Sequence, residues 1–317
     1  MGQELESDRR YAILGTGALG GFYGARLQRS QTEVHFLLRS DYEQVAQRGL
    51  IIESVDGDFT LPQVNAYCDV EKMPPCDVVV VAMKTTQNHQ LRSLLPPVLK
   101  DNGVVLVLQN GLGVEEQVAE IVGGDRVIGG LCFICSNKVA PGHIRHLDYK
   151  KIALGDYADY APAGITPRMQ QIAADFERAG IPIDLEPDLF LARWKKLVWN
   201  IPFNGLSVVL DAVTSEMMAD DAIRTLATQL MQEVQQGAAA LGRTVPDAFV
   251  ASMLDHTAKM KPYLTSMKID YDEKRPLELE AIFHYPLKAA RQAGVELPRI
   301  QMLYQQLFFL DARNRAI

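Results

Sequence analysis

The first half of this 317-residue chain alternates short apolar runs with amphipathic stretches. Three runs are apolar at nearly every position, Tyr11–Leu14, Asp77–Ala82 and Val104–Leu108, and a further strand is predicted at Glu33–Leu38. Strands with this pattern are covered on both faces, as in a parallel sheet. Helices are predicted between them, at Leu19–Arg29, His89–Leu99 and Val114–Val122. This part of the chain therefore predicts alternating strands and helices.

Closely spaced strands follow at Val127–Ser136, His143–Leu147 and Lys151–Leu154, with a turn at Pro141-Gly142. A loop over Asp156–Thr166 leads to a helix over Pro167–Glu177. Beyond Asp184–Asp188 the patterns are helical: Leu189–Leu210, Ala222–Leu241, Asp247–Lys259, Leu277–Ala293 and Ile300–Asp311. The fold class predicted is α/β, with a Rossmann-type dinucleotide-binding domain over residues 1–185 and an all-helical domain over residues 186–317.

Composition supports a folded protein and excludes several classes of function. With 48% hydrophobic and 22% charged residues, the chain can bury a sizeable core. The net charge of −7 and the lack of a basic block argue against nucleic-acid binding. No apolar run approaches the roughly 18–20 residues of a membrane span, and residues 1–10 are too polar for a signal peptide. We therefore expect a cytoplasmic protein with no membrane partner.

The four cysteines do not form a recognisable metal or disulfide pattern. Cys132 and Cys135 lie three residues apart in a β-prone run, and such residues point to opposite faces of a strand. Cys68 and Cys76 lack the spacing of zinc ligands. Buried free thiols are predicted, and no metal site is expected.

A glycine pattern directly after the first strand indicates dinucleotide binding. The run Gly15-Thr16-Gly17-Ala18-Leu19-Gly20 matches G-x-G-x-x-G between a strand and a helix. Gly15 allows the tight turn, Gly17 lets a pyrophosphate approach the backbone, and Gly20 lets the helix pack closely on the strand. The N-terminus of the helix offers N–H groups and the positive end of its dipole to the phosphates.

The end of the second strand favours NADP(H). Arg39 stands where a guanidinium can bind a 2′-phosphate, and Lys84 adds a second cation at the same edge of the sheet. Asp41 is the competing feature, because it can either bind a ribose diol or cap the next helix.

One helix in the second half carries an unusual polar row. Lys196, Asn200 and Asn204 are four residues apart and span roughly 80° of one helix face, among Trp, Phe, Leu and Val. A solvated stripe would have more charged neighbours and fewer aromatic ones. Pro202 removes one helix hydrogen bond, so Asn200 shares the face of Lys196 more securely than Asn204 does.

Together these motifs resemble those of the ketopantoate reductase family, over nearly the whole chain after the first ten residues. The matching pieces are the glycine turn, Met83-Lys84 with Gln87, Gln109-Asn110-Gly111-Leu112-Gly113, Pro141-Gly142-His143-Ile144-Arg145-His146, the helix with Lys196, Asn200 and Asn204, and the segment from Thr265 to Glu280. Several ordered motifs with matched spacing are more specific than the glycine turn alone.

The resemblance implies a role for each matching residue. Lys196 corresponds to the general acid, and Glu278 to a glutamate that contacts the substrate or assists proton transfer. Asn110 corresponds to a residue at the substrate and nicotinamide end of the site, and Asn200, Asn204 and Ser266 to substrate-binding positions. Gly205 and the run Leu279-Glu280-Ala281-Ile282-Phe283-His284 depart from the family pattern, which affects the identity of the substrate more than the reaction type.

The implied function is NADPH-dependent reduction of a 2-oxo acid, with 2-dehydropantoate (ketopantoate) as the first candidate substrate. Another 2-oxo acid, or a non-catalytic regulator that binds NADP(H), are the alternatives. A lactate-dehydrogenase-type site would need a catalytic histidine, but His143 and His146 lie in a predicted hairpin. The ligands of a metal-dependent alcohol dehydrogenase are missing. The sequence leaves a homo-oligomer open.

Overall fold

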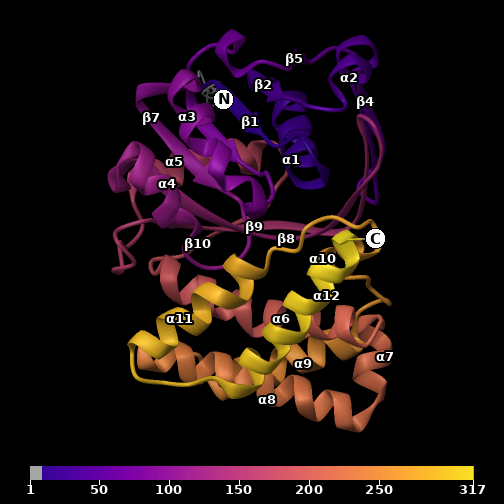
Figure 1. The fold of residues 1–317 in the computed structure, drawn as a ribbon. Helices are drawn as coiled ribbons and strands as arrows, with labels where there is room; N and C mark the ends of the chain where they lie inside the picture. Colours follow the sequence, from indigo (N-terminus) through magenta and orange to yellow (C-terminus); the bar gives the residue numbers. More distant parts are fainter. Residues whose placement is uncertain (1–8, 317) are drawn as a thin grey trace, which may run out of the picture. The chain divides into compact units, whose positions relative to one another are not determined.

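The computed structural model describes residues 9–316 (Figure 1). Residues 1–8, most of the segment judged too polar for a signal peptide, lie outside the described residues, as does Ile317. The chain divides into two compact units. The first, which we call the sheet unit, comprises Met1–Gln109 and Val114–Leu189. The second, the helical unit, comprises Phe190–Ile317 together with Asn110–Gly113, a short loop from the first half of the chain.

The sheet unit is built on one mixed sheet of ten described strands. The strands are β1 (Tyr11–Leu14), β2 (Val34–Leu37), β3 (Leu50–Ser54), β4 (Phe59–Leu61), β5 (Asn65–Tyr67), β6 (Cys76–Val81), β7 (Leu99–Val107), β8 (Val127–Ala140), β9 (His143–Asp156) and β10 (Ile183–Leu185). Their order is β4-β3-β9-β8-β7-β6-β1-β2-β5, and β10 pairs with β9. From β8 to β5 every neighbouring pair is parallel, which confirms the predicted parallel sheet.

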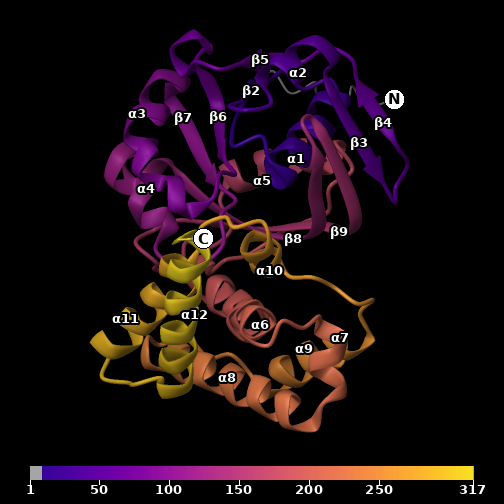
Figure 2. The same ribbon diagram turned by 45° about the vertical axis from the view of Figure 1, so that its right-hand side comes forward.

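Helices cover both faces of this sheet, as the fully apolar strands predict. They are α1 (Ala18–Arg29), α2 (Tyr42–Arg48), α3 (Leu91–Val98), α4 (Val114–Val122) and α5 (Pro167–Arg178), with 3₁₀ turns η1 (Val70–Lys72), η2 (Thr85–Gln90) and η3 (Gly124–Arg126). Figure 2 shows α3 and α4 on one face, and α1 and α5 on the other.

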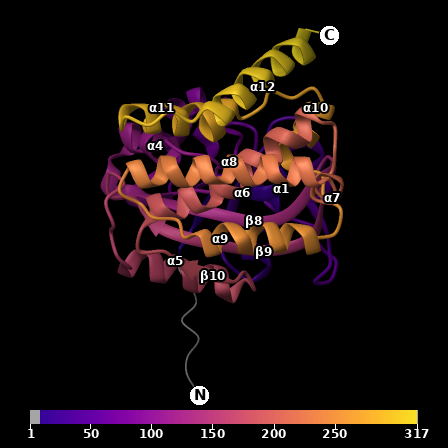
Figure 3. The same ribbon diagram turned by 90° about the horizontal axis from the view of Figure 1, so that it is seen from below.

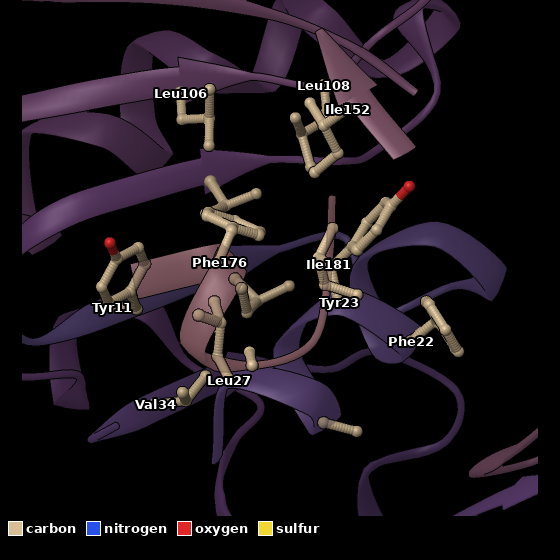
Figure 4. Packing of buried hydrophobic residues seen from close by; sticks show 14 of the residues in the cluster. Tyr11, Phe22, Tyr23, Leu27, Val34, Leu106, Leu108, Ile152, Phe176 and Ile181 are labelled. Atoms are coloured by element: carbon tan, nitrogen blue, oxygen red, sulfur yellow. The ribbon is translucent and has the colours of Figure 1, made fainter. Parts of the chain in front are cut away.

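The core between the sheet and helices α1 and α5 is aromatic and aliphatic (Figure 4). The ring of Tyr11 meets that of Phe176 edge-on, with centroids 6.2 Å apart. The Tyr11 hydroxyl donates to Asp175 Oδ2 at 2.7 Å, so the only polar atom of this side chain is satisfied inside the core. Ala12, the next residue of β1, is equally buried but does not belong to this core. Burial on alternate faces explains why every residue of the strand is apolar.

The hairpin of β8 and β9 differs in one respect from its predicted form. The segment predicted as two strands, at His143–Leu147 and Lys151–Leu154, is the single strand β9. The polar residues between them stay in the strand because Asp148 pairs with Cys135 of β8 across a bulge. Tyr149, with φ of +51°, accommodates the irregularity.

The helical unit contains the described helices α6 (Leu189–Val209), α7 (Thr214–Ala219), α8 (Asp221–Ala240), α9 (Asp247–Lys259), α10 (Ser266–Asp272), α11 (Tyr285–Gln292) and α12 (Pro298–Ala316). A π-helical turn over Glu280–His284 leads into α11, where the sequence predicts one continuous α-helix. Figure 3 shows α8 beside α9 and α11, and α8 also packs on α7 and α12. The short helices α7 and α10 are not predicted by the sequence pattern.

Helix α6 is enclosed by other helices of this unit. The ring of Trp194 packs on Gly237 of α8, where an added Cβ would lie 2.9 Å from Cη2. Trp199 Nε1 donates to Thr257 Oγ1 of α9 at 3.0 Å. Leu303 of α12 packs closely on Gly205. Contacts on three sides explain why α6 is apolar around most of its circumference.

All four cysteines are free. Cys76, Cys132 and Cys135 are buried, as predicted, but Cys68 is exposed, which corrects the prediction for that residue. Among residues 9–316, no group of three or more His, Cys, Asp or Glu side chains is arranged to hold a metal ion. Over the same residues, no helix has both the length and the apolar character needed to cross a membrane.

Gly20→Ala is expected to lower the free energy of unfolding by about 1–3 kcal/mol, because tightly packed contacts do not accept an extra methyl group. The new Cβ would lie 2.9 Å from Ile13 Cγ2 and closer still to the Gly15 carbonyl oxygen. Urea unfolding followed by circular dichroism measures the change. Gly17→Ala is the control, because its Cβ would meet no atom within 4 Å. We expect this control to cost less than about 1 kcal/mol, and equal losses in both variants would contradict the packing argument.

Candidate functional site

The first group of candidate residues lies at the carboxyl edge of the sheet. Strands β7, β6, β1 and β2 are parallel neighbours, so their carboxyl ends share one edge. The glycine turn follows β1, Arg39 follows β2 and Lys84 follows β6. The chain continues from β1 to β2 on one side, whereas β6 flanks β1 on the other. This reversal is where parallel α/β sheets bind their ligands.

The glycine turn is held between two neighbouring strand ends. Gly15 has φ of +100°, and a Cβ on it would lie 2.6 Å from Met83 Cα. Only glycine combines this backbone conformation with so close an approach. Thr16 Oγ1 donates to the Leu37 carbonyl oxygen at 2.9 Å, which attaches the turn to the end of β2.

The N-terminus of α1 fits the phosphates of a dinucleotide. Gly17 is the N-cap residue, and a Cβ placed on it would meet nothing within 4 Å. No side chain caps the helix, and its first turn, from Ala18 through Leu19 to Gly20, contains no acidic residue. Leu19 is half-buried and Gly20 is buried. Because helix N–H groups and the positive dipole end face this open space, the residues present suit a pyrophosphate.

Arg39 and Asp41 differ in their exposure and in the number of hydrogen bonds that their side chains accept or donate within the protein. Arg39 is exposed, and its Nη1 donates to Gln87 Oε1 at a long 3.4 Å. Asp41 is only 5% exposed and accepts from Lys138 Nζ at 2.9 Å, from Ser40 Oγ at 2.9 Å and from Gly142 N at 3.2 Å. A ribose diol would have to displace these partners, whereas Arg39 can turn to a 2′-phosphate. The geometry therefore favours NADP(H) over NAD(H).

The hydrogen bonds of Asp41 also determine its titration. Burial acts to raise the pKa of this carboxyl group, but the hydrogen bonds from Lys138, Ser40 and Gly142 outweigh it and lower the pKa overall. The folded protein therefore holds Asp41 as a carboxylate.

Lys84 and Gln109 are neighbours of the glycine turn at the same edge. Lys84 is half-buried and precedes η2 in an extended conformation. Gln109 Nε2 donates to the Met83 carbonyl oxygen and to Asn88 Oδ1, both at 2.7 Å. Gln109 thus ties the end of β7 to the segment after β6. The sequence reasoning did not assign this role, although Gln109 opens the Gln-Asn-Gly-x-Gly run.

The second group of candidates lies in the helical unit, on α6. Lys196 is half-buried, Asn200 is 6% exposed and Asn204 is 2% exposed. Lys195 points elsewhere, with its Nζ 5.9 Å from the centroid of the Phe249 ring on α9. No described residue forms a hydrogen bond with Asn204 Oδ1, although this atom is buried. A buried carbonyl oxygen without a donor marks a place where a polar ligand or water is needed.

A chain of hydrogen bonds joins α6 to the start of α10. Ser207 Oγ donates to the Asn204 carbonyl oxygen at 3.0 Å and lies 2.8 Å from Thr265 Oγ1. Thr265 caps α10 by accepting from Lys268 N at 3.2 Å. Ser266, the first residue of α10, directly follows Thr265 and therefore lies close to α6. It is half-buried. The sequence analysis assigned no role to Ser207 or Thr265. The available signal was Thr265 itself, since a threonine directly before a helix is typical of an N-cap.

Glu278 lies between α10 and the π-helical turn and is 5% exposed. Its backbone is fixed on both sides. The Glu278 carbonyl oxygen accepts from Ile282 N at 3.2 Å, and Leu277 N donates to Asp311 Oδ1 at 3.1 Å. Glu280, two residues later, is exposed. Of the two carboxylates in this segment, Glu278 is the one held inside the unit.

Asn110 also belongs to the helical unit, although it follows strand β7 of the sheet unit. It is half-buried. Two residues on, Leu112 N donates to the Ala281 carbonyl oxygen at 2.8 Å. The loop that carries Asn110 is therefore attached to the turn that follows Glu278.

The histidines of the β8–β9 hairpin have structural partners. His143 Nε2 lies 2.8 Å from Glu53 Oε1 on β3. His146 is buried against the Phe22 ring, and its Nδ1 lies 2.8 Å from Ser54 Oγ. Both contacts join β9 to β3 or α1, which agrees with the structural role predicted for these two residues.

Comparison with known proteins identifies relatives along both units. Residues 11–159 match the family model described as Ketopantoate reductase PanE/ApbA, and residues 188–310 match the one described as Ketopantoate reductase PanE/ApbA C terminal. A 2-dehydropantoate 2-reductase of a Nostoc species is 66% identical over 310 residues, which cover 98% of this chain and 97% of that protein.

Solved structures agree with this family. The crystal structure of 2-dehydropantoate 2-reductase from Geobacter metallireducens is 45% identical, with a TM-score of 0.91, and the match covers 94% of this chain and 98% of that one. The corresponding protein from Methylococcus capsulatus is 32% identical, with a TM-score of 0.87, and the match covers 96% of this chain and 97% of that one.

Asp41→Asn is expected to lower the free energy of unfolding by about 1–3 kcal/mol at neutral pH, because Lys138 and the Gly142 N–H lose a charged acceptor. Since the pKa of Asp41 is lowered in the folded state, its contribution is present above about pH 4 and disappears as the pH falls through the folded-state value. The difference between wild type and variant should therefore shrink in acid, as measured by urea unfolding at several pH values.

The same variant is expected to keep the ratio of NADPH to NADH use within about threefold of wild type, because Asp41 is engaged inside the sheet unit. A gain in NADPH preference of tenfold or more would instead make Asp41 a ribose contact.

Proposed function

Because this chain belongs to the ketopantoate reductase family, we propose that it catalyses the NADPH-dependent reduction of 2-dehydropantoate to pantoate, a step of pantothenate biosynthesis. It is then an NADP-dependent oxidoreductase acting on a small 2-oxo acid. The observation that carries the proposal is the polar row of Lys196, Asn200 and Asn204 on the enclosed helix α6. A lysine and two amides do not stabilise a packed apolar core at these positions. Carbonyl reduction, in contrast, needs a proton donor and neutral groups that orient the substrate.

The two domains predicted from the sequence have different roles in this proposal. The Rossmann-type domain, over residues 1–185, binds NADP(H). The all-helical domain, over residues 186–317, binds the substrate and carries the proton donor. Groups for the cofactor are Gly15, Thr16, Gly17, Ala18, Leu19, Gly20, Arg39 and Lys84, with Asn110 at the nicotinamide end. The open space at Gly17 and the exposed Arg39 support this assignment.

The bound cofactor supplies a hydride to C2 of the oxo acid. As the C2 carbonyl is reduced, negative charge develops on its oxygen. Lys196 Nζ donates a proton to that oxygen as general acid and stabilises the developing charge. The half-buried position of Lys196 limits the access of water that would otherwise weaken this interaction.

Neutral groups orient the substrate. Asn110, Asn200, Asn204 and Ser266 offer amide and hydroxyl groups for its carboxylate, carbonyl and hydroxyl oxygens. The buried Asn204 Oδ1 can only accept a hydrogen bond, so it suits a hydroxyl group of the substrate rather than its carboxylate. Glu278 binds a hydroxyl group or keeps Lys196 in place. A carboxylate that accepts from a substrate hydroxyl favours a 2-oxo acid that carries one.

Location and assembly are also part of the proposal. Four free cysteines, one of them exposed, suit the reducing cytoplasm. The substrate is a small molecule, with nucleic acid and membrane not expected as partners. A homo-oligomer is compatible with the exposed Phe308 and Phe309 of α12.

Turnover of NADPH with 2-dehydropantoate, compared with a panel of other 2-oxo acids, tests the function directly. We expect 2-dehydropantoate to have a kcat/KM at least tenfold above that of every other member. A faster member would identify a reductase of a different 2-oxo acid. Tight NADPH binding without turnover of any member would instead identify a regulator that binds the cofactor.

Arg39→Ala is expected to raise the KM for NADPH about tenfold or more, because a charge-assisted contact to the 2′-phosphate is lost. The kcat should stay within about threefold, since that phosphate is remote from hydride transfer. Steady-state kinetics with NADPH and NADH measure both. NADH kinetics are the internal control and should not change. A wild-type enzyme that uses both cofactors equally well would contradict the role of Arg39.

Lys196→Ala is expected to lower kcat by about 10²–10⁴-fold, the usual contribution of one positioned acid. Binding of NADPH, followed by fluorescence titration, should stay within about threefold. Lys195→Ala is the matched control. Its ammonium lies near Phe249, away from the row of Lys196, so its kcat should change less than threefold.

A different outcome would reassign Lys196. If KM for the oxo acid rose while kcat stayed near wild type, Lys196 would be a binding group rather than the acid. Equal losses in both lysine variants would mean that the catalytic face of α6 has been misidentified.

A further inference from the structure

The loop Asn110–Gly113 meets the π-helical turn Glu280–His284 through their backbones. A Cβ on Gly111 would lie 2.5 Å from the Ala281 carbonyl carbon and 2.6 Å from Ala281 Cβ. Gly111 also has φ of +96°. No side chain larger than a hydrogen atom can stand at this position without moving the two segments apart.

The Ala281 carbonyl group is available to the loop because its own helix does not use it. In an α-helix it would accept from Tyr285 N, but that N–H bonds to the Glu280 carbonyl oxygen instead, which is the π-type bond. The π-type donor for Ala281 would be residue 286, which is Pro286 and has no N–H. The Leu112 N–H takes this place at 2.8 Å.

The geometry points to a backbone clamp, formed by Gly111 and Leu112 with Ala281, that positions Asn110 relative to Glu278. Asn110 directly precedes Gly111, and Glu278 is held three residues before Ala281 by its own helical bond to Ile282. The clamp therefore joins two groups assigned to the substrate under the proposed function, on which this inference rests. Gly111, Leu112 and Ala281 are positioning residues, and Pro286 acts by leaving the carbonyl free.

The clamp also assigns the loop to one of the two units. The loop follows β7, where cofactor contacts are expected, yet the Leu112 N–H bonds to Ala281 of the helical unit, and Gly111 lies against the backbone of the same residue. If the units move relative to each other, Asn110 travels with Glu278 and α6. The loop is thus preformed for the oxo acid before NADPH binds.

Hydrogen exchange of the full chain without ligands tests the clamp independently of activity. The Leu112 amide is expected to exchange at least 10²-fold more slowly than an unstructured amide, with no NADPH or oxo acid present. Fast exchange of Leu112 in the free protein, slowed only by added NADPH, would overturn the inference, because the cofactor would then order the loop.

Gly111→Ala supplies the functional test. The kcat/KM for 2-dehydropantoate is expected to fall about 10²-fold, the cost of misplacing a positioned group by about 1 Å. The Kd of NADPH should stay within about threefold, because the glycine turn and Arg39 are untouched and Asn110 is assigned only to the nicotinamide end of the cofactor. Leu112 should lose its protection. Gly57→Ala is the matched control. Its φ is +104° and its Cβ would meet nothing within 4 Å, so it carries the same backbone strain without the contact.

Other outcomes separate this inference from the proposed function. Equal kinetics in Gly111→Ala and Gly57→Ala, with an active wild type, would overturn the clamp alone. An inactive wild type whose Leu112 is protected, and loses protection in Gly111→Ala, would refute the proposed function and leave the clamp standing. Should Gly111→Ala not fold, Pro286→Ala provides the second variant. It returns an N–H to the helix, so faster exchange of Leu112 is expected, and unchanged exchange would contradict the account of the free carbonyl.

Discussion

The backbone contact between the glycine turn and the segment after β6 is the constraint on which the sheet unit depends. Gly15 allows the chain leaving β1 to pass directly beside Met83, and Gly20 lets α1 return against the same strand. A larger residue at Gly15 would separate the two neighbouring strand ends, and one at Gly20 would push α1 away from β1. Because the turn is this tight, the first N–H groups of α1 emerge at the point where the strand order reverses, and Gly17 keeps the space before them open. One short segment thus meets the packing requirement and presents N–H groups that suit a phosphate.

Elements that depend on local sequence were predictable, and those that depend on distant partners were not. β1, α1 and α4 were predicted to within a residue because apolar runs, a glycine turn or helical spacing define them locally. β3 and β4 were missed because each has at most five residues and is defined by its pairing with another strand rather than by a local pattern. β3, for example, pairs with β9, about 90 residues away. Helix α10 was missed for a related reason. Its seven residues carry one local signal, the capping Thr265. The hydrogen bond between Thr265 and Ser207 of a distant helix is not visible in any local pattern.

The same distinction applies to the candidate site. The glycine turn and the row on α6 are visible as spacing within one element, so their residues could be named from sequence. The engagement of Asp41 with Lys138 could not be, because the lysine comes from β8, nearly 100 residues later. Nor could the attachment of Asn110 to the helical unit be predicted, because it depends on a π-turn that the sequence pattern presents as an ordinary helix. Pro286 was the local signal, and its effect on the carbonyl of a residue five positions earlier is clear only from the hydrogen bonds.

Buried polar side chains differ in whether the structure supplies their hydrogen bonds. In the sheet unit, Asp41 and Asp175 are buried but accept several hydrogen bonds, so their burial costs little. In the helical unit, Asn204 Oδ1 is buried without a donor, which costs about 1–3 kcal/mol relative to a satisfied group. An apolar residue would remove that cost, and most of the rest of α6 is apolar. Stability alone therefore does not account for this amide, and a bound hydrogen-bond donor, such as a hydroxyl group or water, would satisfy its oxygen.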